Sequence, residues 1–404
     1  MKTNNNIPAY RFQGFEDDWE EVKLGEVLVE YNKKSEIENQ FELLSSTNSG
    51  IEPRSGRVSG ESNIGYKIIK RGMVVLSPQN LWLGNINYNA KFEIGIVSPS
   101  YKVFNINGPN ELYLATVLRL PKMFFEYAQA SVQGASIVRR NLDLDLFGSI
   151  LVQLPSFPEQ TAIGTFFSTL DRHITLHQRK LDTLKEQKKS YLKLLFPAKG
   201  QTKPALRFQG FEDDWELRKL GEISTHRGGT AIEKHFSEDG KYKVISIGSY
   251  GLDNKYIDQK IRAVENEVTR SKVVNKNELT MVLNDKTANG NIIGRCLLIE
   301  ADDEFVINQR TEIISFNSVI YPKFAYVVLN GVFREQVKKI VQGGTQIYVN
   351  YTSVEQLYLS LPSLPEQEVI GSFFSTLDQE IAQVEDKLAS LKEMKKTLLR
   401  KLFV

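Results

Sequence analysis

Apolar side chains recur at alternating steps of four and three residues along two long stretches of the chain, 154–196 and 361–403. This heptad spacing allows helices to pack against each other, so each stretch predicts one long amphipathic helix. A helix of this length would extend over roughly 55 Å. The apolar seam positions are Ile163, Phe167, Leu170, Ile174, Leu181, Leu184 and Leu195 in the first stretch, and Ile370, Phe374, Leu377, Ile381, Val384, Leu388, Leu391, Leu398 and Leu402 in the second.

The two stretches are copies of one sequence. They align without a gap and are identical at 25 of 43 positions. Ser156 and Glu159 in the first copy, and Ser363 and Glu366 in the second, have the spacing of a capping box. This spacing predicts where each helix begins.

The heptad seam does not decide between two possible packing partners for each helix. Each helix could pack against the core of its own domain, but the regular repetition in two copies favours packing of the helices on each other. A whole variable region separates the copies, which favours an antiparallel pair. Lys188 and Lys395 fall on the seam. We expect each of them to reach solvent along its aliphatic stem or to meet a carboxylate.

A second segment of the chain is also duplicated. Residues 11–27 and 207–223 match at 14 of 17 positions. The chain therefore consists of this segment, a variable region and a long helix, followed by the same three parts again. The variable regions, 28–153 and 224–360, differ in length and sequence. The arrangement is typical of a gene duplication and predicts a pseudo-two-fold internal repeat.

Both variable regions contain short strand-like runs bounded by turn residues, then a helical pattern and a polar segment. The helical patterns cover 111–129, interrupted at Pro121, and 322–340. The polar segments 133–141 and 342–350 occupy matching places before the long helices. The strand-like runs are 66–70, 73–76, 92–97 and 101–104 in the first region, and 242–247, 279–283, 292–293, 296–299 and 311–315 in the second.

These patterns predict an α+β fold with two globular domains, separated by two long helices that pack as an antiparallel coiled coil. The expected parts are a first domain at 1–153 that includes segment 11–27, a central spacer helix at 154–200, a second domain at 201–360 that includes segment 207–223, and a C-terminal spacer helix at 361–404.

Composition narrows the class of protein only slightly. The chain has 404 residues, of which 41% are hydrophobic and 25% charged, as in ordinary globular proteins. A net charge of +2 neither establishes nor excludes a nucleic-acid partner. The single cysteine, Cys296, excludes an intramolecular disulfide and is expected to be a buried structural thiol. The N-terminus lacks the apolar core of a signal peptide, and no apolar run could span a bilayer, so we expect a cytoplasmic protein.

The sequence contains no recognisable catalytic motif. Gly240-Lys241 is followed by Tyr242, which does not fit a phosphate-binding loop. The Asn-Pro-Pro-aromatic and Asp-Pro-Pro-Tyr tetrapeptides of amino-methyltransferases are absent. His173 and His177 are four residues apart but lack an acidic or cysteine partner of motif type. We therefore expect no catalytic residues, no metal and no cofactor bound by this chain.

The duplicated helix carries a family resemblance. The tandem pattern L-P-x-x-P-E-Q…I-G-x-F-F-S-T-L-D…K-L-x-x-L-K-x-x-K-K-x-x-L-x-x-L-F, with two dissimilar domains between the repeats, resembles the DNA-specificity (S) subunit of type I restriction-modification systems. The resemblance covers essentially the whole chain. It implies that each variable region is a target-recognition domain reading one half of a bipartite, asymmetric DNA site. It also implies that the paired helices set the gap between the half-sites.

The resemblance further implies partners and cofactors. Two copies of a modification (methyltransferase) subunit, which carry S-adenosylmethionine, bind the repeated frame. Restriction (motor-nuclease) subunits, which use ATP and Mg²⁺, complete a host-defence complex. The chain would be a non-catalytic part of this DNA adenine methyltransferase and endonuclease complex. From the residues alone, the alternative is a coiled-coil adaptor that binds protein and has no DNA specificity.

Polar and basic loop residues of the variable regions are the candidates for contact with double-stranded DNA. Arginine pairs with guanine, and asparagine or glutamine with adenine, in the major groove, whereas lysine and threonine more often hold phosphates. The candidates in the first domain are Gln79, Asn80, Asn85, Asn87, Gln133, Ser136, Arg139 and Arg140. Those in the second domain are Lys286, Thr287, Asn289, Asn291, Arg295, Gln309, Arg310, Thr345, Gln346, Tyr348 and Asn350.

Overall fold

The computed structural model describes residues 8, 10–54, 62–136 and 139–403 and divides the chain into two compact units. The first unit comprises Met1–Gln178 with Asp386–Val404, and the second comprises Arg179–Glu385. Each unit combines strands and short helices with part of both long helices, so the expected mixture of helix and strand is confirmed. The four domain boundaries stay a prediction, because the compact units divide each long helix.

The first unit is built around a four-stranded sheet of order β2-β9-β6-β7. Its strands are all antiparallel neighbours. The elements of this unit are β1 (Glu20–Lys23), α1 (Leu24–Val27), β2 (Leu28–Glu30), β3 (Leu44–Thr47), β4 (Gly50–Pro53), β5 (Lys67–Lys70), β6 (Val74–Leu76), η1 (Leu81–Leu83), β7 (Ile86–Tyr88), β8 (Ile94–Val97), β9 (Lys102–Ile106), α2 (Glu111–Val117), α3 (Pro121–Gln129), β10 (Ser131–Ser136), β11 (Arg139–Leu142), α4 (Leu144–Ser149) and β12 (Leu151–Leu154).

The second unit has a corresponding four-stranded sheet of order β14-β22-β18-β20, and a second sheet of order β16-β15-β21-β17. Its elements are β13 (Glu216–Lys219), α6 (Leu220–Ile223), β14 (Ser224–Gly228), η2 (Glu233–His235), β15 (Tyr242–Ile245), η3 (Ile247–Ser249), β16 (Arg262–Ala263), α7 (Glu267–Arg270), β17 (Val273–Val274), β18 (Leu279–Val282), β19 (Asn284–Asp285), β20 (Cys296–Leu298), β21 (Phe305–Ile307), β22 (Thr311–Phe316), α8 (Pro322–Asn330), α9 (Val332–Val337), β23 (Gln342–Gly343), β24 (Ile347–Tyr348), α10 (Tyr351–Val354) and β25 (Tyr358–Leu361).

The two globular parts share one topology although their sequences differ. In chain order, β2, β6, β7 and β9 of the first unit correspond to β14, β18, β20 and β22 of the second. A helix pair follows the last of these strands in each unit, α2 and α3 in the first and α8 and α9 in the second. Each unit also pairs the strand within its repeated segment with the strand before its long helix, β1 with β12 and β13 with β25. The duplication therefore extends to the fold of the variable regions.

One predicted strand is wrong. Residues 292–293 lie in a loop that ends at Gly294, where φ is 71°. A left-handed residue directly after two apolar residues interrupts the extended backbone that a strand requires. The hairpin β3–β4 lies in the polar segment 30–60, where no strand was predicted, and residues 55–60 of that segment fall outside the described residues.

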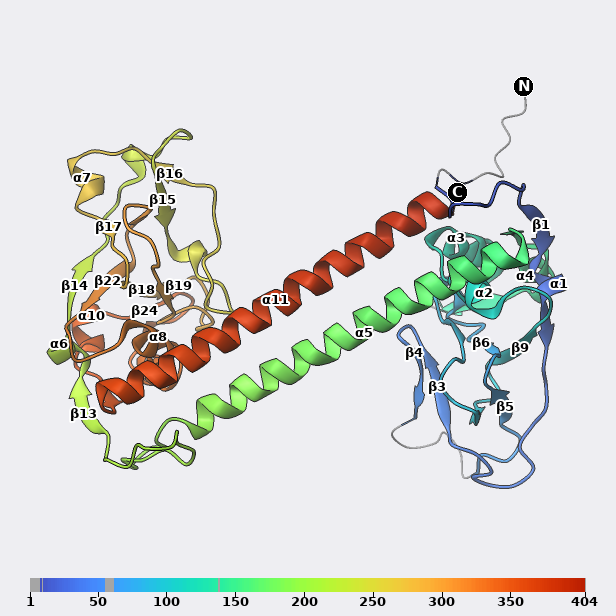
Figure 1. Ribbon diagram of the computed structural model, residues 1–404, viewed down its shortest axis with the longest axis horizontal. Coiled ribbons are helices and arrows are strands. Elements are labelled where there is room, and N and C mark those ends of the chain that lie inside the picture. The colour runs from blue at the N-terminus through green and yellow to red at the C-terminus, as the bar shows by residue number, and fades with distance from the viewer. Residues whose placement is uncertain (1–7, 9, 55–61, 137–138, 404) are drawn as a thin grey trace. The chain divides into compact units, whose positions relative to one another are not determined.

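Two long helices, α5 (Phe157–Leu194) and α11 (Leu364–Leu402), confirm the helices predicted from the heptad pattern (Figure 1). Their seam residues are buried or half-buried. In the first unit, Ile163, Phe167 and Leu170 of α5 join Leu391 and Leu402 of α11 in the core of the domain. Each helix therefore packs both against its own domain and against the other helix. The sequence had left these two packing partners as alternatives, and the structure shows both.

Ion pairs link α5 and α11 in an antiparallel sense within each unit. In the second unit Lys188 contacts Asp378 and Lys185 contacts Glu385, so residues farther along α5 meet residues earlier in α11. In the first unit Lys395 bonds to Asp171, and Lys392 donates to Gln178 at 3.3 Å, which gives the same antiparallel sense. The two seam lysines, Lys188 and Lys395, thus meet carboxylates. This was one of the two outcomes expected for them from the sequence.

The glutamates that begin the long helices have a different role from the predicted capping box. Glu159 is fully buried and accepts from Nε and Nη2 of Arg11 at 2.9 and 2.7 Å. Glu366 accepts in the same way from Arg207 at 2.8 and 2.7 Å. This hydrogen bonding raises the pKa of both arginines. Each carboxylate therefore ties its helix to the repeated segment near the start of the domain.

The neighbouring glutamines attach each long helix to the helix pair of its domain. Gln160 accepts from the Asn110 amide at 2.8 Å and donates to the Pro155 carbonyl at 2.8 Å. Gln367 accepts from the Tyr321 amide at 2.9 Å and donates to the Pro362 carbonyl at 2.9 Å. The repeated Pro-Glu-Gln motif therefore fixes the start of the long helix by side-chain bonds to distant backbone and to an arginine.

Replacing Gly371 by alanine should destabilise the second unit by about 1–3 kcal/mol, because the added methyl group has no space. Its Cβ would lie 2.7 Å from the Phe324 nitrogen. The matched control is Ser372→Ala, at an exposed position of the same helix, where a change of about 0.5 kcal/mol or less is expected. Denaturant titration measures both, and equal stabilities would contradict the close packing.

Candidate nucleic-acid interface

Three polar segments of the second unit come together beside the strand β18–β19. The Leu283 amide donates to the Arg310 carbonyl at 2.9 Å, and the Leu283 carbonyl accepts from the Val349 amide at 2.9 Å. The small sheet β19-β24-β23 extends this contact to the hairpin that contains β23 and β24. The segments 286–291, 309–310 and 342–350 therefore border the same strand.

The exposed candidates on these segments form what we name the second polar face. All of their side chains are exposed, and they include one lysine and one arginine. The members are Lys286, Thr287, Asn289, Asn291, Gln309, Arg310, Thr345, Gln346, Tyr348 and Asn350. The structure thus brings together ten of the eleven candidates predicted for this domain. Whether they contact DNA stays a prediction.

A buried aspartate closes the loop that carries the first members of this face. Asp285 is 4% exposed and accepts from the amides of Thr287 and Ile292, each at 2.9 Å. Burial alone would raise the pKa of Asp285, but the backbone hydrogen bonds hold it below its ordinary value. The carboxylate therefore stays charged at neutral pH and fixes both ends of the loop 286–292.

Arg295 is separate from the second polar face. Its Nε donates to the Asn291 carbonyl at 2.7 Å, and its Nη1 contacts the side chain of Asn254. Burial lowers the pKa of this arginine. Its guanidinium is directed toward the loop around Asn254, so the structure gives it a role within the fold, and we omit it from the interface.

In the first unit, an aromatic contact joins two candidate segments. The guanidinium of Arg140, on β11, lies 4.9 Å from the centre of the Trp82 ring, in the loop between β6 and β7. Arg140 Nη1 also donates to the Ala128 carbonyl at 3.2 Å. Gln79 is exposed and Asn80 half-buried in the same loop. We name the loop 77–84 together with the hairpin β10–β11 the first polar face.

Three further candidates lie on the hairpin of this face. In its backbone register, Gln133 pairs with Arg140, and Ser136 pairs with Arg139. The side chains of Gln133, Ser136 and Arg139 fall outside what the structure describes. These three residues remain candidates through their place in the hairpin, which matches the place of β23–β24 in the second unit.

Asn85 and Asn87 are buried, contrary to the expectation that they face solvent. Asn85 Oδ1 accepts from the Ser46 hydroxyl at 2.6 Å, and Asn87 Nδ2 donates to Ser46 Oγ at 2.7 Å. Arg119 donates to the Asn87 side chain and, at 2.9 Å, to the Asn48 carbonyl. These amides bind the hairpin β3–β4 to the start of β7 and the residue before it, so they do not belong to the interface.

The tryptophans of the repeated segments are core residues. Trp19 is 3% exposed and Trp215 is 4% exposed, each within the main core of its unit. Cys296 is also fully buried, and burial raises the pKa of its thiol above the ordinary value. The thiol is therefore protonated and structural, in agreement with the prediction.

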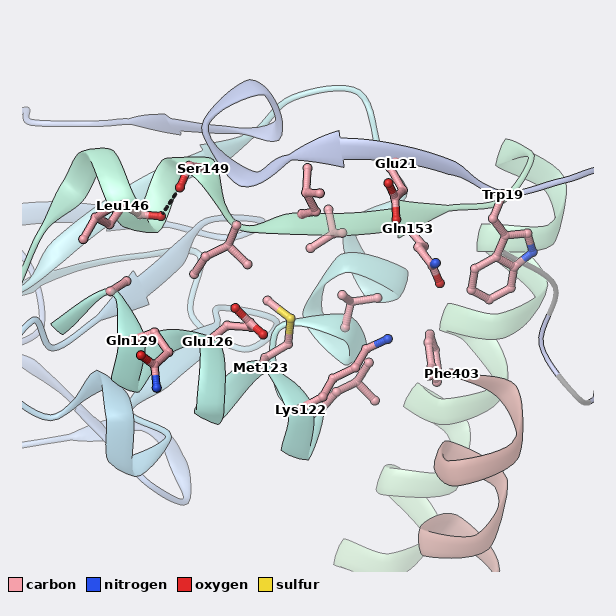
Figure 2. A pocket seen from close by; sticks show the side chains of 16 residues that line it. Trp19, Glu21, Lys122, Met123, Glu126, Gln129, Leu146, Ser149, Gln153 and Phe403 are labelled. Atoms are coloured by element: carbon pink, nitrogen blue, oxygen red, sulfur yellow. Dashed lines mark hydrogen bonds between the residues drawn. The ribbon is translucent and has the colours of Figure 1, made fainter. Parts of the chain in front are cut away.

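A pocket of about 500 Å³ lies in the first unit among β12, α3 and the end of α11 (Figure 2). Its walls include Trp19, Glu21, Lys122, Glu126 and Phe403. Burial lowers the pKa of Lys122. Its lining comes from the repeated segment, the helix pair and the C-terminal helix, together with the segment around α4. The pocket is therefore distinct from the first polar face.

Within the described part of the chain, no group of three or more His, Cys, Asp or Glu side chains is placed to hold a metal ion. Across the same residues, no helix is both long and apolar enough to cross a membrane.

Comparison with known families assigns the chain to one protein family. The family model for the type I restriction modification DNA specificity domain matches residues 16–186 and again residues 212–393. The chain belongs to this family. The two matches contain the two variable regions and most of both long helices, so the specificity domain occurs twice, in agreement with the repeat.

Relatives of this specificity-domain protein match it along most of its length. The type I restriction enzyme MjaVIII specificity subunit of Methanocaldococcus jannaschii is 22% identical over 408 residues, covering 95% of this chain and 91% of the relative. The crystal structure of the type I restriction-modification system S subunit from M. genitalium is similar with a TM-score of 0.67. That match covers 98% of this chain and 99% of the other at 16% identity, and it shows a common fold.

Proposed function

We propose that this chain is the sequence-specific DNA-binding subunit of a type I restriction-modification complex. The main support for this proposal is the internal repeat. The repeated segments and long helices carry two domains that share one topology but have different polar faces. A shared topology lets both domains approach DNA in the same way. Their different side chains would then read different bases, which makes the recognised site bipartite and asymmetric.

In this proposal the two long helices act as a spacer. Their heptad seam and the antiparallel ion pairs in each unit support an antiparallel coiled coil. A helical pair resists bending and stretching far better than a flexible linker does. The spacer would therefore hold the gap between the two half-sites constant.

Repeated surfaces support the binding of two identical partners. Matching positions of the repeat carry exposed apolar side chains, Leu151 with Tyr358 and Phe157 with Leu364. The repeated acidic run Glu-Asp-Asp at 16–18 and 212–214 is also exposed, and negative charge disfavours contact with DNA phosphates. A surface that occurs twice suits two copies of one protein. We propose that these are two modification (methyltransferase) subunits.

The cofactors of the proposed complex belong to the partner subunits. The modification subunits would carry S-adenosylmethionine, and restriction subunits would use ATP and Mg²⁺, while this chain supplies specificity without catalysis. Incubating the isolated chain with DNA, Mg²⁺ and S-adenosylmethionine tests this division of labour. Cleavage or methylation by the purified chain alone would contradict it.

The salt dependence of DNA affinity distinguishes this function from that of a protein-binding adaptor. We expect the logarithm of the association constant to fall linearly with the logarithm of salt concentration, by about 0.9 for each phosphate contact. The double variant Lys286→Ala, Arg310→Ala should reduce this slope by about two if both side chains hold phosphates. Lys199→Ala, at an exposed site in the linker, is the matched control. Affinity that does not depend on salt would favour the adaptor.

A further inference from the structure

A buried arginine holds the loop between β18–β19 and β20 from the inside. Arg334, in α9, is 7% exposed. Its Nε donates to the Ile293 carbonyl at 2.9 Å, and its Nη2 donates to the carbonyls of Gly290 and Asn291 at 2.8 and 2.9 Å. One guanidinium therefore anchors three backbone carbonyls of the four-residue stretch 290–293, which includes Asn291 of the second polar face.

The arrangement depends on the shape of the guanidinium group. Its donors are fixed in one plane, so they can reach several carbonyls at once, which a lysine ammonium on a flexible stem does less well. Burial lowers the pKa of Arg334, but an arginine stays charged at neutral pH. The loop is also constrained by Gly290 and Gly294, where φ is 63° and 71°. Its path is thus fixed by backbone contacts on the protein side.

The opposite side of the same loop is free to contact a ligand. Lys286, Thr287 and Asn289 are exposed. Asp285 accepts from the Thr287 and Ile292 amides. With Asp285 at the start and Arg334 at the end, the loop is held in one conformation while its polar side chains remain accessible. This is the property expected of a preorganised recognition loop.

The first unit has a counterpart built from different residues. Arg119, at the junction of α2 and α3, donates to the Ile86 carbonyl at 3.3 Å and to the side chain of Asn87. It also donates to the Asn48 carbonyl at 2.9 Å. The loop between β6 and β7 corresponds in sheet order to the loop between β18 and β20. Ile86 and Asn87 are the first residues of β7, so Arg119 binds the strand that directly follows its loop, whereas Arg334 binds carbonyls within its loop.

We propose that Arg334 and Arg119 are positioning residues that act before DNA binds. Arg334 sets the conformation of its recognition loop directly, and Arg119 fixes the start of β7, where the loop of the first polar face ends. This inference rests on the proposed DNA-binding function. A loop ordered in advance does not lose conformational freedom on binding, so its base contacts are made at lower cost. Without the arginine, base discrimination falls at the half-site read by that unit, whereas attraction to phosphates persists.

The test uses the full-length chain and the duplexes that the wild type selects from a randomised DNA pool. Arg334→Lys and Arg119→Lys keep the charge but remove the planar set of donors. Each variant is expected to lose discrimination between selected and scrambled bases by roughly tenfold or more at one half-site. The affected half-site differs between the two variants, and the other half-site changes by about twofold or less. Each variant thus serves as the control for the other.

Equal losses at both half-sites, or full discrimination in both variants, would overturn the proposal. Thermal unfolding of each variant shows whether it folds. Hydrogen exchange of the wild-type chain provides a measurement that needs no variant. The amides of Thr287 and Ile292 should be protected without DNA, because Asp285 accepts from both. Protection that develops only after DNA is added would overturn the idea of a preformed loop.

A failure of the underlying function would give a different result. If the wild type selects no sequence from the pool, the proposed DNA specificity is contradicted and with it the role of the two arginines in recognition. Selection by the wild type with unchanged discrimination in both variants contradicts the positioning role alone.

Discussion

Replacing Glu366 by alanine should lower the free energy of unfolding of the second unit by about 3 kcal/mol. The Glu366 side chain is 1% exposed, and it accepts two hydrogen bonds from Arg207. Removing the carboxylate leaves a largely buried guanidinium without its counter-charge, which costs more than the pair itself contributes. Denaturant titration of the variant and the wild type measures the difference.

An exposed ion pair in the same unit supplies the matched control. Glu216 contacts Arg218 at 2.9 Å, but the two side chains are 70% and 52% exposed. Glu216→Ala should therefore change stability by about 1 kcal/mol or less. If Glu366→Ala costs no more than Glu216→Ala, the role given to the Pro-Glu-Gln motif is wrong. The double variant Arg207→Met, Glu366→Ala should recover part of the loss, because no charge remains buried.

Seven residues inserted into both long helices should lengthen the gap in the recognised DNA site and leave both half-sites unchanged. The insertions belong between 178 and 179 and between 385 and 386, where the two compact units divide each helix. Seven residues preserve the heptad seam and add about 10 Å, close to three base pairs at roughly 3.4 Å each. Methylome sequencing of a host that expresses the chain with a modification subunit would measure the gap.

The control for this experiment inserts the same seven residues between 200 and 201, in the exposed linker after α5. A flexible connection of this kind does not set a distance, so the gap should stay the same. An unchanged gap after the helix insertions would refute the spacer role. A changed gap after the linker insertion would show that connections outside the helices contribute.

The long helices could be predicted from the sequence because their signal is local and occurs twice. A heptad seam depends on neighbours three and four residues away, so it is visible without knowledge of the fold. The break of the first helical pattern at Pro121 was also predictable from a local signal, since α2 ends at Val117 and α3 begins at Pro121. The resemblance to the specificity-subunit family also depended on the duplicated helix.

Long-range partners could not be read from the sequence. Glu159 has the spacing of a capping residue, but its partner Arg11 lies 148 positions away. Asn85 and Asn87 are polar and suggested exposure, yet Ser46 and Arg119 satisfy them inside the fold. Contacts of this kind depend on tertiary structure, which a local pattern does not contain.

The candidate interface was predictable in its segments and less so in its individual side chains. The polar segments before the long helices were identified by composition, and the hairpin β23–β24 places one of them beside β19. The same composition does not distinguish an exposed loop residue such as Asn289 from a buried one such as Asn87. That distinction depends on packing, and it removed Asn85, Asn87 and Arg295 from the interface.

The first unit is built from two segments far apart in the chain, Met1–Gln178 and Asp386–Val404, and this affects how the chain folds during synthesis. Phe403 packs 6.2 Å from Trp19 and 6.0 Å from Phe167, measured between ring centres, and the Tyr10 amide donates to the Lys401 carbonyl at 3.1 Å. The core of the first unit is therefore complete only after residues 391–403 have been synthesised. All residues of the second unit, Arg179–Glu385, emerge earlier. We therefore expect the usual N-terminal-first order of domain folding to be reversed, so that a chain lacking residues 391–403 would leave the aromatic side chains around Trp19 and Phe167 accessible to proteases.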